Sequence, residues 1–188
     1  WRESGFAVDC VAVNLSARQF FDRQLPERVS SALTEAGLDP QSLELEITES
    51  ILMANTEETL SLFADLKHLG VKLSIDDFGT GFSSLSYLKR FRVDNLKIDH
   101  SFVRDISTDA DDAAIVRAIV NLAHSLQLHV IAEGVETREQ IEYLTHCGCQ
   151  EAQGFYFARP MPAAALPAEV ARLERELAHA LSTGGASA

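Results

Sequence analysis

Cysteine is scarce in this sequence, with three among 188 residues. An odd and sparse set indicates reduced thiols rather than a disulfide framework. Cys147 and Cys149 have no second Cys or His pair at zinc-finger spacing, which argues against a zinc site. Apolar runs fall short of the roughly 18 residues that a membrane span needs, and no secretory signal is recognisable. We therefore expect a cytoplasmic segment without membrane contact of its own, in a parent protein that other segments could anchor to a membrane.

Basic residues are also in the minority. The chain has 16 Lys and Arg against 28 Asp and Glu, for a net charge of -12. This balance argues against binding duplex nucleic acid through a basic surface. It does not exclude a small phosphorylated ligand, because bound divalent cations would reverse the local sign of the charge. An initiator methionine is missing as well, since the chain begins at Trp1, and we expect it to be cut from a longer protein.

What the sequence does contain is a regular alternation of short apolar strands with amphipathic helical segments. This alternation predicts a parallel sheet with helices outside it. About six strand-helix units are present, whereas a TIM (β/α)8 barrel has eight and takes roughly 250 residues. The predicted fold class is therefore an α/β barrel truncated at its N-terminal side, with one domain over residues 1–181 and a disordered tail over 182–188. The expected strands are 8–14, 43–47, 71–75, 95–98, 128–132 and 150–154, and the expected helices are 26–36, 55–69, 84–90, 109–127, 137–147 and 167–181.

Local signals fix the ends and faces of several helices. Gly37 and Gly70 follow apolar-periodic segments and predict helix stops. Thr137 is placed to cap the helix that follows it, and Gln140 can complete a capping box. For the long helix we expect one buried stripe, formed by Ile115, Ala118, Ile119 and Leu122.

Polar residues stand where these strands end, and the C-terminal ends of parallel strands meet at one mouth of a barrel. Their side chains are hard oxygen donors, which favours Mg²⁺ or Mn²⁺, with Ca²⁺ as a competitor, over Zn²⁺. They are more numerous than the protein ligands of one Mg²⁺ usually are, so we expect two cations that share one aspartate, an arrangement that suits phosphodiester hydrolysis. Lys97, the one cation among these acids, would orient the attacking water or neutralise charge on the phosphate. The candidate ligands are Asn14, Glu46, Asp76, Asp77 and Glu133.

Each of these residues also has a plain structural interpretation. A single Glu at a strand end is most often a solvated loop residue, Lys97 alone would be a salt-bridge partner, and Asp76-Asp77 alone could form a turn. The alternation of acids with Leu45 and Ile47 nevertheless predicts that Glu44 and Glu46 point inward, where a carboxylate needs a cation.

The glycine-rich segment after Asp77 invites two other interpretations. Asp77-Phe78-Gly79 matches the metal-binding tripeptide of kinases, but no glycine-rich nucleotide loop precedes it and no His-Arg-Asp loop is present. Gly79-Thr80-Gly81 lacks the Lys-Ser/Thr of a P-loop. We expect Gly79, Thr80 and Gly81 to form a mobile lid beside the metals.

Several motifs, in this order and spacing, resemble the EAL-domain family of cyclic-di-GMP phosphodiesterases from about Val11 to Pro162. They are Val13-Asn14-Leu15-Ser16, Leu45-Glu46-Ile47-Thr48-Glu49-Ser50, the run from Ile75 to Leu85, Leu96-Lys97-Ile98-Asp99, Ala132-Glu133-Gly134-Val135-Glu136, and Gln153-Gly154-Phe155-Tyr156-Phe157 followed by Pro160-Met161-Pro162.

The resemblance implies a modified eightfold barrel that hydrolyses one bond of cyclic-di-GMP to the linear dinucleotide pGpG, in bacterial second-messenger signalling. Carried over by motif, the five candidate ligands hold the metals, Asp76 bridges them and Lys97 holds the catalytic water. Glu136 and Gln153 support the site, and Glu49 anchors the lid. Since the lid of this family lies near a dimer interface, a homodimer is also implied.

One departure from the family pattern bears on activity. The Glu-Ala-Leu motif and the Arg that follows it are absent from the chain and would fall before Trp1. That Glu is a metal ligand in the family, and that Arg holds a substrate phosphate. We therefore expect the fragment alone to be poorly stable and weakly active or inactive, whereas the parent domain is an enzyme. The alternatives are a catalytically inactive receptor for cyclic-di-GMP and a scaffold with a vestigial site.

Overall fold

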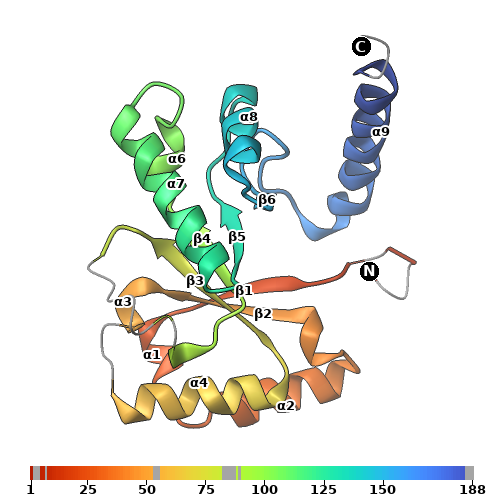
Figure 1. The fold of residues 1–188 in the computed structure, drawn as a ribbon. Helices are drawn as coiled ribbons and strands as arrows, with labels where there is room; N and C mark the ends of the chain where they lie inside the picture. Colours follow the sequence, from red (N-terminus) through yellow and green to blue (C-terminus); the bar gives the residue numbers. More distant parts are fainter. Residues whose placement is uncertain (2–4, 7, 53–55, 82–87, 89, 185–188) are drawn as a thin grey trace.

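The structure is a computed structural model that describes residues 1–188 except 2–4, 7, 53–55, 82–87, 89 and 185–188. One parallel sheet runs through it, and its strands are hydrogen-bonded in chain order (Figure 1). The strands are β1 (Val11–Leu15), β2 (Leu43–Thr48), β3 (Lys72–Phe78), β4 (Asn95–Ile98), β5 (His129–Ala132) and β6 (Glu151–Ala152). This confirms the predicted strand order and the parallel α/β architecture.

The central strands are buried on both faces, but only one face is apolar, because Ser74, Asp76 and Lys97 lie on the other. Leu73, Ile75, Leu96, Ile98 and Val130 are all fully buried, as expected of a parallel sheet. By contrast, β1 is exposed along most of its length. Among the described residues no strand pairs with the outer edge of β1 or of β6, so the sheet is open.

Helices alternate with the strands, and three short α-helices in the described residues were not expected from the sequence. The unexpected α-helices are α1 (Ala17–Phe20), α3 (Glu49–Leu52) and α6 (His100–Arg104), each beginning within two residues of a strand end. A single helical turn carries too few residues to show a 3.6-residue period. The others are α2 (Leu25–Ala36), η2 (Pro40–Ser42), α4 (Glu57–Leu69), α7 (Ala110–Ser125), α8 (Arg138–Cys147), η3 (Ala163–Ala165) and α9 (Leu166–Gly184).

Most of the predicted helix ends are confirmed. Gly37 and Gly70 end α2 and α4 in the left-handed conformation, which glycine adopts at low cost. The N-cap of α4 is Thr56, whose side chain accepts a hydrogen bond from the Thr59 amide, while Asn55, the first residue of the expected helix, lies outside the described residues. Most of the helix expected over 84–90 lies outside them too.

The buried stripe of α7 was predicted partly wrongly. Ile119 is buried as expected, but Ile115 and Ala118 are exposed and Leu122 is only half-buried. The sheet covers a neighbouring face instead, through Val116 and Val120. Because α7 is apolar on two adjoining faces, its periodicity could not tell which one the sheet would cover.

The capping box of α8 is present as predicted. The Thr137 side chain accepts from the Gln140 amide, and the Gln140 side chain accepts from the Thr137 amide. We predict that Thr137→Ala lowers the free energy of unfolding by about 1 kcal/mol. Thermal melts should then show a fall in Tm of roughly 2–4 °C. The matched control is Thr145→Ala, an exposed position inside the same helix, and equal losses in both variants would contradict a capping role.

The C-terminal helix α9 begins one residue before the expected start and continues to Gly184, beyond the expected end. Residues 185–188 of the expected tail lie outside the described part. Figure 1 shows α9 standing apart from the other helices, joined to the sheet by the segment after β6. No helix in the described residues is both long and apolar enough to span a membrane.

Candidate active site

The candidate residues come together because neighbouring parallel strands deliver them to one edge of the sheet. Asn14 pairs in register with Glu46, and Thr48 pairs with Asp76 on the next strand. Lys97 pairs with Ile131, two residues before Glu133. The acids and Lys97 therefore lie at or near the C-terminal ends of adjacent strands.

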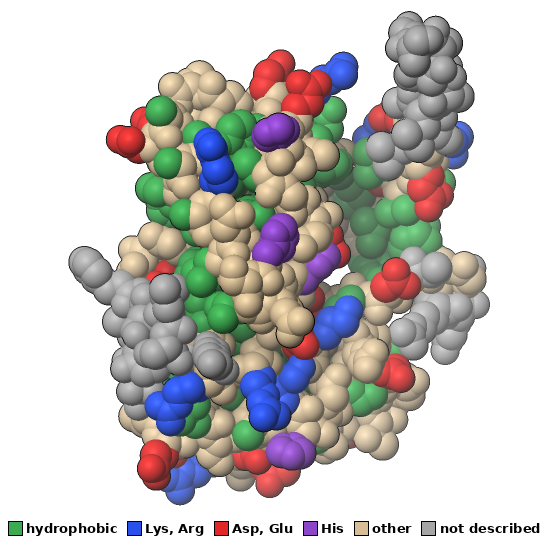
Figure 2. All heavy atoms as spheres, viewed as in Figure 1, with side chains coloured by type: hydrophobic (Ala, Val, Ile, Leu, Met, Phe, Trp, Pro, Cys, Tyr) green, Lys and Arg blue, Asp and Glu red, His purple; other side chains and the backbone are tan. Residues whose placement is uncertain are grey.

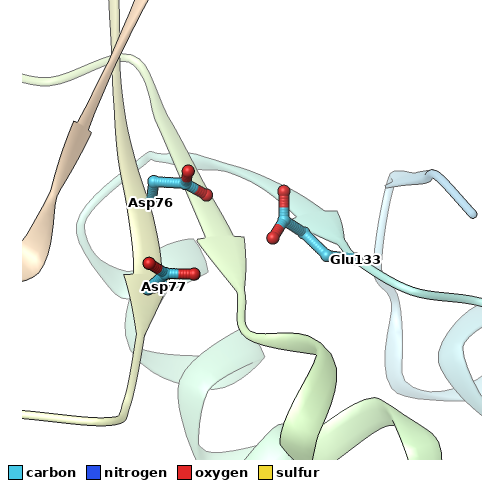
Figure 3. Close-up of side chains that lie close together, drawn as sticks. All are labelled: Asp76, Asp77 and Glu133. Atoms are coloured by element: carbon cyan, nitrogen blue, oxygen red, sulfur yellow. The ribbon is translucent and has the colours of Figure 1, made fainter. Parts of the chain in front are cut away.

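Three carboxylates form the centre of this site. Asp76, Asp77 and Glu133 each offer an oxygen atom, and these atoms all lie within 4.8 Å of one another. Figure 3 shows the two aspartates projecting from β3 toward Glu133, which follows β5. Asp76 is buried, and the other two are half-buried. Such close carboxylates repel one another unless positive charge lies between them.

Lys97 supplies part of that charge. Its buried Nζ lies 2.6 Å from Glu46 Oε1, 2.5 Å from Glu133 Oε1 and 3.4 Å from Asp76 Oδ1. Burial by itself would lower the pKa of Lys97, but the hydrogen bonds to Glu133 and Glu46 outweigh it and raise the pKa well above its ordinary value. Lys97 is therefore a permanent cation that ties β2, β3 and the end of β5 together.

The single ammonium group of Lys97 does not compensate the negative charge of all these carboxylates. Burial and the neighbouring Asp76 raise the pKa of Asp77. Burial also raises the pKa of Glu133, although Lys97 opposes the shift. Among the described residues, the buried Oδ1 of Asp76 has no hydrogen-bond partner, and its ion pair with Lys97 is long, at 3.4 Å. Raised carboxyl pKa values and a buried oxygen without a hydrogen bond fit a hard divalent cation held by oxygen ligands.

The two glutamates of β2 are buried as predicted, whereas Asn14, the candidate ligand with an amide side chain, is exposed. Glu44 and Glu46 both lie in the sheet interior. Asn14 lies on the exposed strand β1, next to Glu46 in the register. The structure thus brings Glu46, Asp76, Asp77 and Glu133 to Lys97, with Asn14 at the open edge beside them.

Glu49 joins the candidate lid to the site. Its buried carboxylate Oε2 accepts hydrogen bonds from the amides of Gly79, at 3.0 Å, and Gly81, at 3.2 Å. Thr80 Oγ1 donates to the carbonyl of Asp77. Gly79 has a φ of 104°, and a Cβ there would lie 2.8 Å from the ring of Phe102, so this turn requires glycine. Residues 82–87, which follow Gly81, lie outside the described residues.

A cavity of about 690 Å³ opens beside Glu133. Glu136 and Gln153 also line it, and Gln153 Nε2 donates to Glu133 Oε1 at 2.6 Å. Phe155 and Arg159 form another part of the wall, with the guanidinium 4.6 Å from the centre of the ring. The volume falls within the range of small-molecule sites.

Asp99 was given no role by sequence reasoning, although it is buried in the site. Its carboxyl group hydrogen-bonds that of Asp77. It also caps α6 by accepting from the amide and the hydroxyl of Ser101. Burial raises the pKa of Asp99, but the Ser101 hydrogen bonds outweigh it and lower the pKa overall. The signal was present, because Asp99 follows β4 as the other acids follow or end their strands.

Comparisons with known proteins bear on this arrangement. The model of the EAL domain family matches residues 1–160. The bifunctional diguanylate cyclase/cyclic di-GMP phosphodiesterase MucR of Pseudomonas aeruginosa is 50% identical over 171 residues, which are 91% of this chain and 25% of that protein. The chain thus spans about a quarter of the length of that relative.

Solved structures agree with the sequence matches. The MucR phosphodiesterase in complex with c-di-GMP superposes with a TM-score of 0.84 at 49% identity, covering 88% of this chain and 67% of that one. Klebsiella pneumoniae BlrP1 with manganese and cyclic-di-GMP gives 0.78 at 34% identity, covering 85% and 41%. These likenesses confirm the predicted fold class, an α/β sheet of the EAL barrel type that is open in the described residues.

Proposed function

Because the chain belongs to the EAL domain family, we propose that its domain hydrolyses one phosphodiester bond of cyclic-di-GMP to give pGpG in bacterial second-messenger signalling. The observation that carries this proposal is the cluster of Asp76, Asp77 and Glu133 beside a cavity large enough for a nucleotide ligand, with one buried oxygen that accepts no hydrogen bond from the described residues. A purely structural carboxylate cluster would cost stability and would need no adjoining cavity.

The proposed cofactors are Mg²⁺ or Mn²⁺, two per site, with Ca²⁺ as a competitor. Asn14, Glu46, Asp76, Asp77 and Glu133 would hold them, with Asp76 shared. When bound, the cations would promote loss of a proton from the attacking water and offset charge on the phosphate. The oxygen-only ligand set and the manganese bound in BlrP1 support this assignment.

The side chains have separate tasks in the proposed reaction. Lys97 would hold the water by a hydrogen bond from its ammonium group, whose pKa the hydrogen bonds to Glu133 and Glu46 raise in the metal-free site. Gln153 fixes the orientation of Glu133, and Glu136 lines the substrate cavity. The exposed ring of Phe155 and the Arg159 guanidinium offer surfaces on which a purine base can stack. The homodimer implied by the resemblance stays a prediction.

The direct test incubates the parent domain with cyclic-di-GMP and Mn²⁺ or Mg²⁺ and separates the products by chromatography. We expect pGpG from the parent domain in the presence of either cation, none with a chelator, and little or none from the chain alone. Calorimetry in Ca²⁺ measures binding without turnover. Tight binding in Ca²⁺ with no product in Mn²⁺ or Mg²⁺ would identify a receptor instead of an enzyme.

Replacing the lid anchor should weaken turnover without unfolding the chain. In Glu49→Gln one oxygen remains as an acceptor, but the two hydrogen bonds from Gly79 and Gly81 lose their charge assistance, which roughly halves their strength. We expect kcat to fall about tenfold, equivalent to about 1.4 kcal/mol of barrier, with Tm nearly unchanged. Glu58→Gln, at an exposed ion pair with Arg23, is the control. A kcat equal to that of the control would contradict an anchoring role.

A further inference from the structure

A second pocket lies away from the carboxylates and takes no part in the proposed reaction. It opens between α4 and the chain that leads into β4, with a volume of about 380 Å³. Lys67 of α4 hydrogen-bonds the main-chain carbonyl of Val71, just before β3, and the side chain of Asp94, just before β4. The pocket is therefore at the N-terminal ends of the strands, at the end of the sheet opposite the candidate active site.

The lining of this pocket is unusual for so acidic a chain. Its basic residues are Lys67, His68, Arg90 and Arg92, and its apolar wall includes Leu60 and Ala64. Among the described residues no acidic side chain lines it, although the chain has a net charge of -12. Two other surface pockets, on α2 and on the N-terminal part of α4, are lined by residues of both signs.

Much of this positive charge is uncompensated. Lys67 is paired with Asp94 at 2.7 Å. Arg90 and Arg92 are exposed, and in the described part of the chain neither makes an ion pair. Figure 2 shows Lys, Arg and His side chains gathered on the lower part of this face, where Figure 1 places α4. Two free guanidinium groups and His68 thus stand beside an apolar wall.

The backbone conformation that exposes Arg92 is strained. Its φ of 46° is in the left-handed region, which costs a side chain other than glycine roughly 1–2 kcal/mol. Its neighbours Phe91 and Val93 are both buried, so the chain turns sharply to expose Arg92 between two anchored residues. Strain of this kind is found most often at functional positions.

We propose that this basic pocket, formed by Leu60, Ala64, Lys67, His68, Arg90 and Arg92, is a docking site for an acidic segment of a partner protein. One aliphatic side chain of the segment would enter against Leu60 and Ala64, and its carboxylates would bind Arg90 and Arg92. Charge complementarity favours this occupant, because a guanidinium group binds a carboxylate through two parallel hydrogen bonds. The apolar wall favours a segment that also carries an aliphatic side chain over a purely ionic ligand.

The test uses fluorescence anisotropy with a labelled peptide of about twelve residues, in which two Leu one helical turn apart stand among Glu residues. We expect saturable binding that weakens as salt rises from about 50 to about 300 mM. The double variant R90E/R92E should weaken binding at least about tenfold. A peptide with Ser in place of Leu should bind several-fold more weakly than the parent peptide.

Two further variants separate docking from general electrostatics and from folding. R23E/R28E makes the same change in net charge at arginines that already pair with Glu58 and Asp22, and it should leave binding nearly unchanged. Arg92→Gly removes the guanidinium while relieving the backbone strain, so it should weaken binding and keep or raise Tm. The proposal would be overturned if the peptide showed no saturable binding. It would also be overturned if both double variants lost the same affinity, or if the peptide with Ser in place of Leu bound as tightly as the parent peptide.

Discussion

In the parent domain, Asp76→Asn is expected to lower kcat for cyclic-di-GMP hydrolysis by at least about a thousandfold, while the protein stays folded. The substitution keeps the size of the side chain and removes the charge of the residue that would bridge both cations. Losing one preorganised electrostatic partner of a transition state costs roughly 10²–10³ in rate, and a shared ligand affects both cations at once. Product chromatography measures the loss, and Asp65→Asn on the exposed face of α4 is the matched control.

The same variant should separate catalysis from stability. Without metal, Asp76 raises the pKa of both Asp77 and Glu133 by repulsion, so removing its charge should leave Tm equal or slightly higher. With Mn²⁺ at about a hundred times its Kd, the native chain should gain roughly 2.7 kcal/mol of stability, which is about 5–10 °C in Tm. Asp76→Asn should lose most of that gain. Full turnover, or an unchanged response to Mn²⁺, would contradict the role of Asp76.

The sequence predicted the strand order and the grouping of the acids because both follow from short-range patterns. Parallel strands of equal direction must bring their C-terminal ends to one edge, so Glu46, Asp76 and Glu133 could be placed together without a structure. The charge balance could not be predicted in the same way. That Lys97 contacts Glu46, Asp76 and Glu133 at once depends on the register of β2 to β5 and on the length of one side chain.

Other features depend on tertiary contacts that a linear pattern does not contain. Asp99 belongs to the site through its hydrogen bond to Asp77. Arg92 is an ordinary basic residue in the sequence, and it is distinguished by its φ and by the lack of an ion pair with any described residue. The buried face of α7 was predicted partly wrongly for the same reason, because packing against the sheet determines which apolar face of the helix is buried.

Lys97→Met is expected to destabilise the metal-free chain by about 3–5 kcal/mol, the usual cost of removing one partner of a buried ion pair. Methionine fills nearly the same volume, so the loss would come from charge and not from a cavity. Glu46, Asp76 and Glu133 would then face one another with no cation among them. Urea unfolding in a chelator measures the effect, and Lys72→Met, on a half-buried residue at the start of β3, is the control.

Bound divalent cation and low pH should both reduce the loss of stability in Lys97→Met. Asp77 and Glu133 already have pKa values raised above their ordinary 3.8 and 4.5. A carboxyl group with a raised native pKa stabilises the fold below its ordinary pKa, and that contribution is lost as pH rises through the raised value. Lys97→Met should raise both pKa values further, so its deficit should be small near pH 4 and grow toward pH 7.

Divalent cation should restore more stability to the variant than to the native chain, because the cation would replace the missing ammonium charge. Turnover should stay low even when stability is restored, since methionine cannot donate a hydrogen bond to water. A deficit that is independent of pH, or one that Mn²⁺ does not reduce, would show that Lys97 stabilises the sheet by packing and not by balancing the carboxylates. That outcome would also weaken the case for cations at this site, because the case depends on uncompensated negative charge around Asp76.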